Sequence, residues 1–126
     1  KKYICKNQIK KGIGGLKELI KLNHDGCSTA LMIDQRVTEG IKSNFFGKKA
    51  FTTTIPAQLT KKFGLPVVPI FIERIGNLKF KMKVFDPINF SKEDSVEDVT
   101  SKLNKTLENM ILNNPNNWIW THNRWK

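Results

Sequence analysis

The spacing of apolar and polar positions predicts two helices in the first half of the chain. Lys10–Leu22 places its apolar side chains on one face with lysines between them, and the polar turn at 23–26 ends it. A second helix is expected over Pro56–Phe63. Proline suits a first helical turn, Thr54 is near enough to cap the helix, and Gly64 suits the position after its end.

The longest helical pattern lies near the C-terminus. Ser95-Val96-Glu97-Asp98 is close to a capping box and predicts its start, and Asn113-Asn114-Pro115 predicts its stop. Its expected apolar stripe consists of Val96, Val99, Leu103, Leu107, Met110 and Ile111.

The last segment gathers all three tryptophans of the protein: Trp118, Trp120 and Trp125. Because tryptophan is costly to expose, we expect this segment to pack back over the core, with Arg124 and Lys126 at its rim. The alternative is a surface on which the bases of a single-stranded nucleic acid stack.

Two apolar runs predict buried strands. Thr29–Ile33 is expected to form a strand that stops at Asp34, as strands of open α/β sheets do where they deliver a charged group to the crevice. Leu65–Ile72 is nearly continuous and β-branched, which predicts a strand buried on both faces. Its prolines favour a start after Pro66 and a bulge at Pro69.

A strict alternation at Lys79–Phe85, after a turn at Gly76-Asn77, predicts a hairpin. Phe80, Met82 and Val84 are expected to face the core, with lysines on the opposite face. The element order helix–strand–helix–strand–strand–helix predicts an α/β fold with a mixed sheet flanked by helices. A length of 126 residues suits one domain, residues 1–126.

Residues 34–54 have no clean period of either 2 or 3.6, and we expect a long functional loop there. Asp34 either binds or orients a polar or cationic group, such as Arg36 or Arg74, or caps the loop through its own backbone. Phe45 and Phe46 either form an apolar floor for a hydrocarbon chain or a stacked base, or pack beneath the loop. The candidate binding residues are Gln35, Arg36, Gly40, Phe45, Phe46, Gly47, Lys48, Lys49, Thr52, Thr53 and, from outside the loop, Arg74.

The charge of the chain favours several classes of partner and does not decide among them. The formal net charge of +11 favours nucleic acid, anionic lipid, phosphorylated substrates or an acidic carrier protein, unless the lysines merely solvate one face. Cys5 and Cys27 have no metal-like spacing, so we expect free thiols and no metal site. His24 is followed directly by Asp25, a spacing that points the two side chains apart, and His122 lies beside Arg124, so we expect neither histidine to act as a general base. No nucleophile elbow or phosphate-binding loop is present.

Four blocks of sequence resemble one family when they are taken together. They are DQRVTEG…FFGKKAFTTTIPAQL at 34–59, VVPIFIER at 67–74, the Thr100…Asn104…Glu108 spacing, and WIWTHNRWK at 118–126. This pattern is similar to the lipid A lauroyl and myristoyl acyltransferases, which are lysophospholipid-acyltransferase-like enzymes. The similarity runs from about Lys10 to Lys126.

The resemblance implies a glycerolphosphate-acyltransferase-like fold, incomplete at its N-terminal side. It implies transfer of a fatty acyl chain from acyl carrier protein to a hydroxyl of a phosphorylated glycolipid, the lipid A precursor. The acyl carrier protein is a co-substrate, and no cofactor is expected. The implied location is the membrane surface at the cytoplasmic face of the bacterial inner membrane, with the anchor segment outside this chain.

The family's general base is a His followed, after four residues, by Asp or Glu. Thr29 stands at that spacing from His24, and the sequence ends before that spacing from His122 is reached. We therefore expect the C-terminal portion of a longer enzyme, inactive alone, with Asp34 in a supporting role. The alternative is a non-catalytic basic module that binds nucleic acid or anionic lipid through the lysines of 79–83 and the tryptophan segment. No nucleic acid partner is expected under the first hypothesis.

Overall fold

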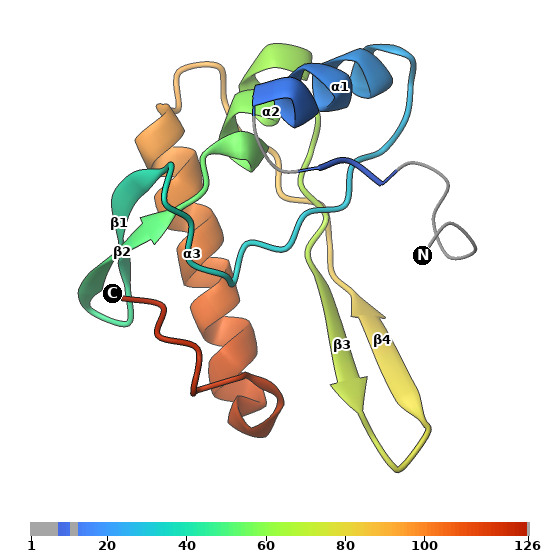
Figure 1. Cartoon of the computed structure of the whole chain (residues 1–126), viewed down its shortest axis with the longest axis vertical. Coiled ribbons are helices and arrows are strands. Elements are labelled where there is room, and N and C mark those ends of the chain that lie inside the picture. The colour runs from blue at the N-terminus through green and yellow to red at the C-terminus, as the bar shows by residue number, and fades with distance from the viewer. Residues whose placement is uncertain (1–7, 11–12, 126) are drawn as a thin grey trace. The chain divides into compact units, whose positions relative to one another are not determined.

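The computed structural model describes residues 8–10 and 13–125 (Figure 1). The chain divides into two compact units, Lys1–Leu31 and Met32–Lys126, which are described separately. The first unit contains α1 (Ile13–His24), which confirms the first predicted helix with slightly shifted bounds. The predicted turn ends it: Gly26 has a φ of 82°, and the amide of Cys27 donates to the carbonyl of Leu22 at 2.9 Å.

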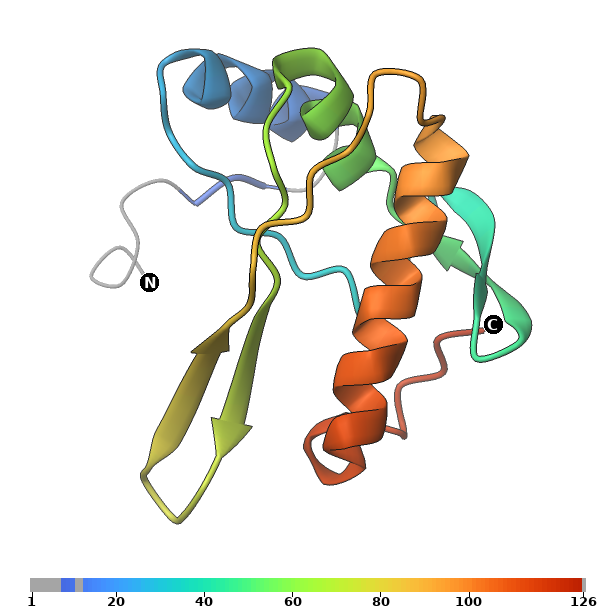
Figure 2. The same ribbon diagram turned by 180° about the vertical axis from the view of Figure 1, so that it is seen from behind.

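The second unit is arranged along its longest helix, and Figures 1 and 2 show a β-hairpin on either side of this helix. Its elements are β1 (Ile41–Phe45), β2 (Lys48–Thr52), α2 (Ile55–Phe63), β3 (Ile70–Arg74), β4 (Phe80–Val84), α3 (Val96–Asn113) and the short 3₁₀ helix η1 (Pro115–Asn117).

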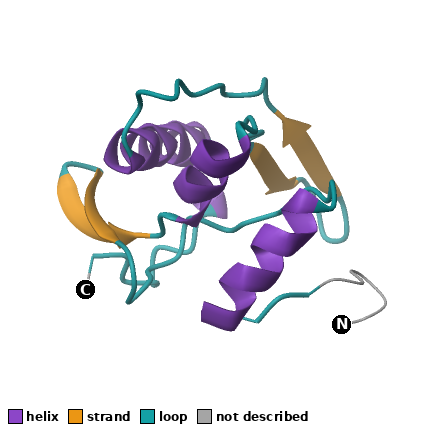
Figure 3. Ribbon diagram, turned by 90° about the horizontal axis from the view of Figure 1, so that it is seen from above, coloured by secondary structure: helices purple, strands orange, loops and turns teal. Residues whose placement is uncertain are grey.

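The predicted mixed sheet is wrong. Strands β1 and β2 form one antiparallel pair, and β3 and β4 form another (Figure 3). The predicted strand Thr29–Ile33 has no regular secondary structure, so Asp34 does not end a strand but lies in a bend. An α/β composition is confirmed, but the two hairpins are separate sheets.

The prediction of a long irregular loop after Asp34 is also wrong, because this segment contains the β1–β2 hairpin. Ser43 and Thr52, which are polar, occupy inward positions of this hairpin beside Phe45 and Ala50. A search for alternating apolar residues therefore finds no strand there, although the backbone alternates regularly.

Helix α3 starts and stops where the local signals predict. The hydroxyl of Ser95 accepts a hydrogen bond from the amide of Asp98 at 3.0 Å, and the Asp98 carboxylate accepts from the amide of Ser95 at 3.1 Å. The Ser95 hydroxyl also donates to the Asp98 carboxylate at 2.6 Å. This hydrogen bond first, and then the one from the Ser95 amide, lowers the pKa of Asp98 below its ordinary value. Of the predicted stripe, Val99, Leu103 and Ile111 are buried.

Two apolar clusters form along α3. One gathers Phe45, Ala50 and Ile111, and the partly buried side chains packed on it are Phe46, Leu107, Trp118 and Trp125. The other gathers Ala57, Val99 and Leu103, with Ile33, Val67, Ile88, Phe90 and Val96 packed on it. The prediction that the tryptophan segment packs over the core is confirmed for Trp118 and Trp125, whereas Trp120 is 55% exposed.

The predicted place of Arg124 at the rim of that segment is wrong, because Arg124 is fully buried. Its guanidinium finds acceptors on β2, which offset the cost of burying a charge. The predicted place of Lys126 lies outside the described residues.

Helix α2 confirms the second predicted helix. Gly64 ends it with a φ of 65°, and its amide donates to the carbonyl of Thr60 at 2.8 Å. The predicted cap by the Thr54 side chain is wrong, because Thr54 has helical backbone angles and its hydroxyl accepts from the Gln58 side chain at 3.0 Å.

The predicted β3–β4 hairpin is confirmed, but neither face of β4 is buried. Regular strand structure begins only at Ile70, after both prolines, and Val67 forms an isolated bridge with Ile88. The side chains expected to face the core are exposed, Phe80 by 59%, Met82 by 63% and Val84 by 56%. The strand predicted to be buried on both faces is likewise half open, since every second residue of β3 is exposed.

Candidate functional site

The Phe45-Phe46-Gly47 sequence forms the turn of the β1–β2 hairpin. Phe45 pairs with Lys48, so Phe46 and Gly47 make a two-residue loop, with φ values of 50° and 75°. Two successive positive φ values are typical of a type I′ turn, whose twist matches that of the flanking strands. Glycine adopts this conformation freely, but an aromatic residue does so at a cost. The turn therefore needs support from elsewhere in the fold.

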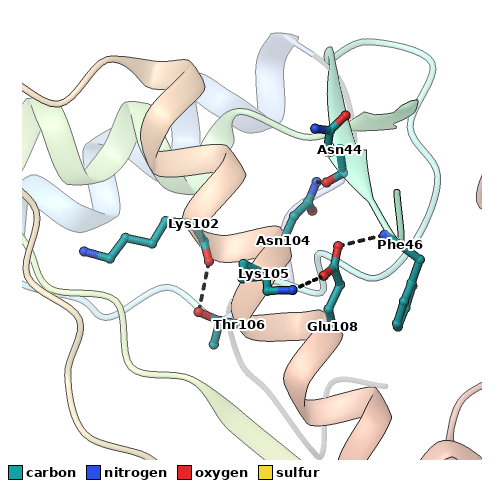
Figure 4. A network of polar contacts seen from close by, with 7 residues as sticks. All are labelled: Asn44, Phe46, Lys102, Asn104, Lys105, Thr106 and Glu108. Atoms are coloured by element: carbon teal, nitrogen blue, oxygen red, sulfur yellow. Dashed lines mark hydrogen bonds and ion pairs between the residues drawn. The ribbon is translucent and has the colours of Figure 1, made fainter. Parts of the chain in front are cut away.

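Glu108 of α3 provides that support (Figure 4). Its carboxylate accepts a hydrogen bond from the amide of Phe46 at 2.7 Å and forms an ion pair with the ammonium group of Lys105 at 2.9 Å. The Glu108 side chain is mostly buried, whereas that of Lys105 is largely exposed. A charge-assisted hydrogen bond to the strained residue thus fastens the turn to the helix.

Asn104, one helical turn before Glu108, fastens both strands. Its side-chain amide donates to the carbonyl of Asn44 at 3.0 Å and to the hydroxyl of Thr52 at 3.1 Å. The residue is fully buried, and its Oδ1 has no hydrogen-bond partner among the described residues. Thr100, Asn104 and Glu108 share one face of α3, because they are spaced four residues apart.

Arg124 closes the cluster from the C-terminal segment. Its guanidinium donates to the Phe51 carbonyl and, at 2.9 Å, to the hydroxyl of Thr52, and it lies 5.3 Å from the ring centroid of Phe45. Burial lowers the pKa of Arg124, and the nearby Asp34 carboxylate acts in the opposite direction. The structure thus gives Asp34 a cationic neighbour in Arg124. We call Thr52, Asn104, Glu108 and Arg124 the hairpin anchor.

The tryptophans surround the turn of the hairpin. The indole of Trp125 donates to the carbonyl of Phe45 at 3.0 Å, and the indole of Trp120 donates to Pro115 at 2.7 Å. Trp118 lies with its ring centroid 6.5 Å from that of Phe46 and 4.7 Å from that of Trp120. Trp118 and Trp125 are therefore committed to packing, and Trp120 is the most exposed of the three rings.

The structure brings most of the predicted binding residues to this hairpin and its surroundings. Phe45 and Thr52 are buried, Asp34, Phe46 and Thr53 are half-buried, and the exposed ones are Gln35, Arg36, Gly40, Gly47, Lys48 and Lys49. The amide of Arg36 donates to Nε2 of His122 at 3.2 Å, which ties this segment to the tryptophan segment. Arg74 is not among them, because it lies on β3 with its guanidinium 5.3 Å from the ring centroid of Phe80.

An open groove of about 570 Å³ runs between the hairpin turn and α3. It is lined by Asn44, Gly47, Asp98, Ser101, Lys102, Lys105 and Glu108. The lysine ammonium groups offer charged donors to an anion, and the two carboxylates limit how much negative charge the groove accepts. Within residues 8–10 and 13–125, no group of three or more His, Cys, Asp or Glu side chains is arranged to hold a metal ion.

A family model described as bacterial lipid A biosynthesis acyltransferase matches residues 5–126. The chain belongs to this family. The resemblance found in the sequence blocks is thereby confirmed. No individually curated protein matches the chain.

Family membership implies acyl carrier protein and a lipid A precursor as substrates, and the family is associated with the inner membrane. None of the helices in the described part of this acyltransferase-family chain is both long and apolar enough to span a bilayer.

No sequence pattern predicted a functional role for Asn104, Glu108 or Arg124, three of the four residues of the hairpin anchor. Asn104 and Glu108 belong to the Thr100…Asn104…Glu108 spacing that resembles the family, and Arg124 was expected at the surface. A signal was present: Thr100, Asn104 and Glu108 stand at helical spacing beside a stripe of Val99, Leu103 and Ile111. Polar residues next to an apolar stripe on an amphipathic helix indicate buried hydrogen bonds to a neighbouring element.

Proposed function

We propose that this chain forms the C-terminal, acyl-handling part of a lauroyl-type lipid A acyltransferase. The reaction would move a fatty acyl chain from acyl carrier protein to a hydroxyl of the lipid A precursor. The observation that carries the proposal is the anchored turn. An apolar ring, Phe46, is held at the protein surface beside Trp118 and Trp120 by the buried carboxylate of Glu108.

The chemistry requires a proton acceptor. The substrate hydroxyl attacks the thioester carbonyl, its proton passes to a general base, and the carrier thiolate leaves and is protonated, so that an ester replaces a thioester. Neither histidine of this chain stands at the family's spacing from a carboxylate. We therefore propose that a segment outside these 126 residues supplies the general base. Asp34, balanced by Arg124, orients that base or the acceptor hydroxyl.

The substrate-binding roles divide by chemistry. Phe46 contacts the acyl chain, and Phe45 supports it from beneath, because the Phe45 ring is fully enclosed. Lys48 and Lys49 are exposed next to the turn and suit phosphate groups or the acidic carrier. Arg74, on the other hairpin, contacts the carrier or the lipid separately.

The remaining predicted residues have subsidiary roles in the proposal. Gln35 and Arg36 border the acceptor site next to Asp34. Gly40 and Thr53 shape the backbone at the open end of the hairpin, where Ile41 pairs with Thr52. No cofactor takes part, and the reaction occurs at the cytoplasmic face of the inner membrane.

The test is acyl transfer in detergent micelles from lauroyl-acyl carrier protein to a radiolabelled lipid A precursor. The chain is assayed alone and together with a family segment that carries the His-x4-Asp or His-x4-Glu motif. We expect no transfer by the chain alone, since loss of a general base typically costs 10²–10⁴-fold, and transfer on complementation. Asp34→Asn should abolish the complemented activity, and Asp25→Asn, in an exposed turn, is the matched control. Robust transfer by the chain alone, or an active Asp34→Asn complex, would refute the assignment.

A further inference from the structure

The backbone that carries Asp34 is tied to the C-terminal segment through a histidine. Residues 34–36 have no regular secondary structure. The amide of Arg36 donates a hydrogen bond to Nε2 of His122 at 3.2 Å, although the two residues are 86 positions apart in the sequence. An imidazole nitrogen that accepts a hydrogen bond carries no proton, so the ring proton of His122 is on Nδ1. His122 is therefore engaged as an acceptor for the backbone next to Asp34.

The backbone around His122 is itself fixed on both sides. The amide of His122 donates to the carbonyl of Ile119 at 3.2 Å and closes a turn. Beyond His122, the guanidinium of Arg124 is enclosed and donates to β2, and the indole of Trp125 donates to the carbonyl of Phe45 at 3.0 Å. The imidazole is exposed, but the segment that presents it is anchored to the hairpin. His122 can therefore restrain Arg36 instead of moving with it.

Arg124 acts on Asp34 with a donor to spare. The Nε of Arg124 is buried and has no hydrogen-bond partner among the described residues. Burial lowers the pKa of Arg124, and the charge of Asp34 opposes this effect. The two groups form no ion pair in the described part of the chain, so the attraction acts through space. It is stronger than at an exposed site, because charges shielded from water are less screened.

We propose that His122 and Arg124 are positioning residues for Asp34. His122 fixes the backbone two residues beyond Asp34, and Arg124 orients the Asp34 carboxylate. The tryptophan segment thus holds the site in place as well as covering the core. This deepens the proposed function and rests on the role given there to Asp34. A carboxylate that orients a base or a hydroxyl must be held accurately, since a misplacement of about 1 Å can cost about 100-fold in rate.

Amide hydrogen exchange of the ¹⁵N-labelled full chain tests the link through His122. His122→Leu should speed exchange of the Arg36 amide about fivefold, as expected for the loss of one ordinary hydrogen bond. His122→Gln should restore slow exchange, because its carboxamide oxygen can accept in place of Nε2. The control His24→Leu changes a histidine whose side chain is 84% exposed, and it should leave the Arg36 amide unchanged. Unchanged exchange in His122→Leu overturns the proposal.

The side-chain Nε–H resonance of Arg124 tests its action on Asp34. Arg124→Lys removes this resonance and so assigns it. Asp34→Asn should shift the Arg124 resonance, and Asp25→Asn, in an exposed turn, should leave it in place. An unshifted resonance in Asp34→Asn refutes the role of Arg124. Neither of these two measurements needs acyl transfer, so they decide this inference independently of the proposed function.

The complemented acyl-transfer assay then distinguishes positioning from substrate binding. His122→Leu should lower kcat about tenfold to 100-fold and leave KM for the carrier and the precursor unchanged, because the proposal places His122 away from both substrates. His122→Gln should recover most of this loss. A higher KM with unchanged kcat, or no recovery by His122→Gln, contradicts positioning. Inactivity of the complemented wild-type chain refutes the proposed function instead.

Discussion

Removing the carboxylate of Glu108 should release the turn of the β1–β2 hairpin from α3. Three substitutions separate its two interactions. Glu108→Ala removes both the hydrogen bond to the Phe46 amide and the ion pair with Lys105. Glu108→Gln keeps a side-chain oxygen for the Phe46 amide but loses the charge, and Lys105→Ala removes the ion pair alone.

The expected magnitudes follow from burial. The Phe46 amide is partly buried and donates to an ionised group. Loss of this hydrogen bond should therefore lower the free energy of unfolding by about 1.5–3 kcal/mol. The ion pair contributes little, because the Lys105 side chain is 69% exposed and well solvated; exposed pairs contribute about 0–1 kcal/mol. We therefore expect Glu108→Ala to cost about 2–3 kcal/mol, Glu108→Gln about 1 kcal/mol, and Lys105→Ala less than about 0.5 kcal/mol.

Urea unfolding followed by tryptophan fluorescence measures these differences. Trp118 lies beside Phe46 and packs on the same apolar cluster, so its emission reports on the region that is perturbed. Linear extrapolation gives the free energy of each variant, with equal m-values as a check that the unfolded surface is unchanged. The reasoning is refuted if Glu108→Gln costs as much as Glu108→Ala, or if Lys105→Ala accounts for most of the loss.

Three further predictions concern stability. Gly40→Ala should cost about 1–3 kcal/mol, because a Cβ there would overlap a carbonyl of β2, whereas Gly14→Ala, with open space, should not destabilise; chemical denaturation compares the two. Arg124→Met should cost about 2–4 kcal/mol in the same assay by leaving acceptors of β2 unpaired, and Arg124→Lys should recover part of the loss. Ser95→Ala should cost about 1 kcal/mol at neutral pH. The pKa of Asp98 is lowered in the folded chain. The contribution of the ionised Asp98 carboxylate to stability is therefore complete at pH values above its ordinary pKa of 3.8, and it is lost as the pH falls through the lower pKa of the folded state. The cost of Ser95→Ala, measured by urea unfolding, should therefore shrink as the pH falls below 3.8.

Local signals in the sequence were sufficient for the helices and for one hairpin. The capping box at Ser95 and Asp98 and the glycine at position 64 act on groups only a few residues away. The alternation before Phe85 likewise depends on neighbouring residues. Such signals act through hydrogen bonds and backbone angles between residues close together in the sequence. They can therefore be recognised without knowing the tertiary structure.

Two features of the fold did not follow from local sequence patterns. The β1–β2 hairpin places Ser43 and Thr52 inward, where an apolar residue is expected. The buried Thr52 hydroxyl is tolerated because it donates to the Ala50 carbonyl and accepts from the side chains of Asn104 and Arg124. The β3–β4 hairpin shows the opposite departure, since its apolar face is exposed. Alternation distinguishes the two faces of a hairpin, but it does not determine which face other elements will cover.

The sequence by itself determined the helices, their ends, the family and the residues gathered near the hairpin turn. Only the tertiary structure decided that Glu108, Asn104 and Arg124 hold that turn. Their partners lie far away along the chain, 62 residues from Glu108 to Phe46, and 52 and 72 residues from Asn104 and Arg124 to Thr52. Whether a charged or polar side chain is solvated or buried depends on such distant partners, because burial is favourable only where a matching hydrogen-bonding group is brought to meet it.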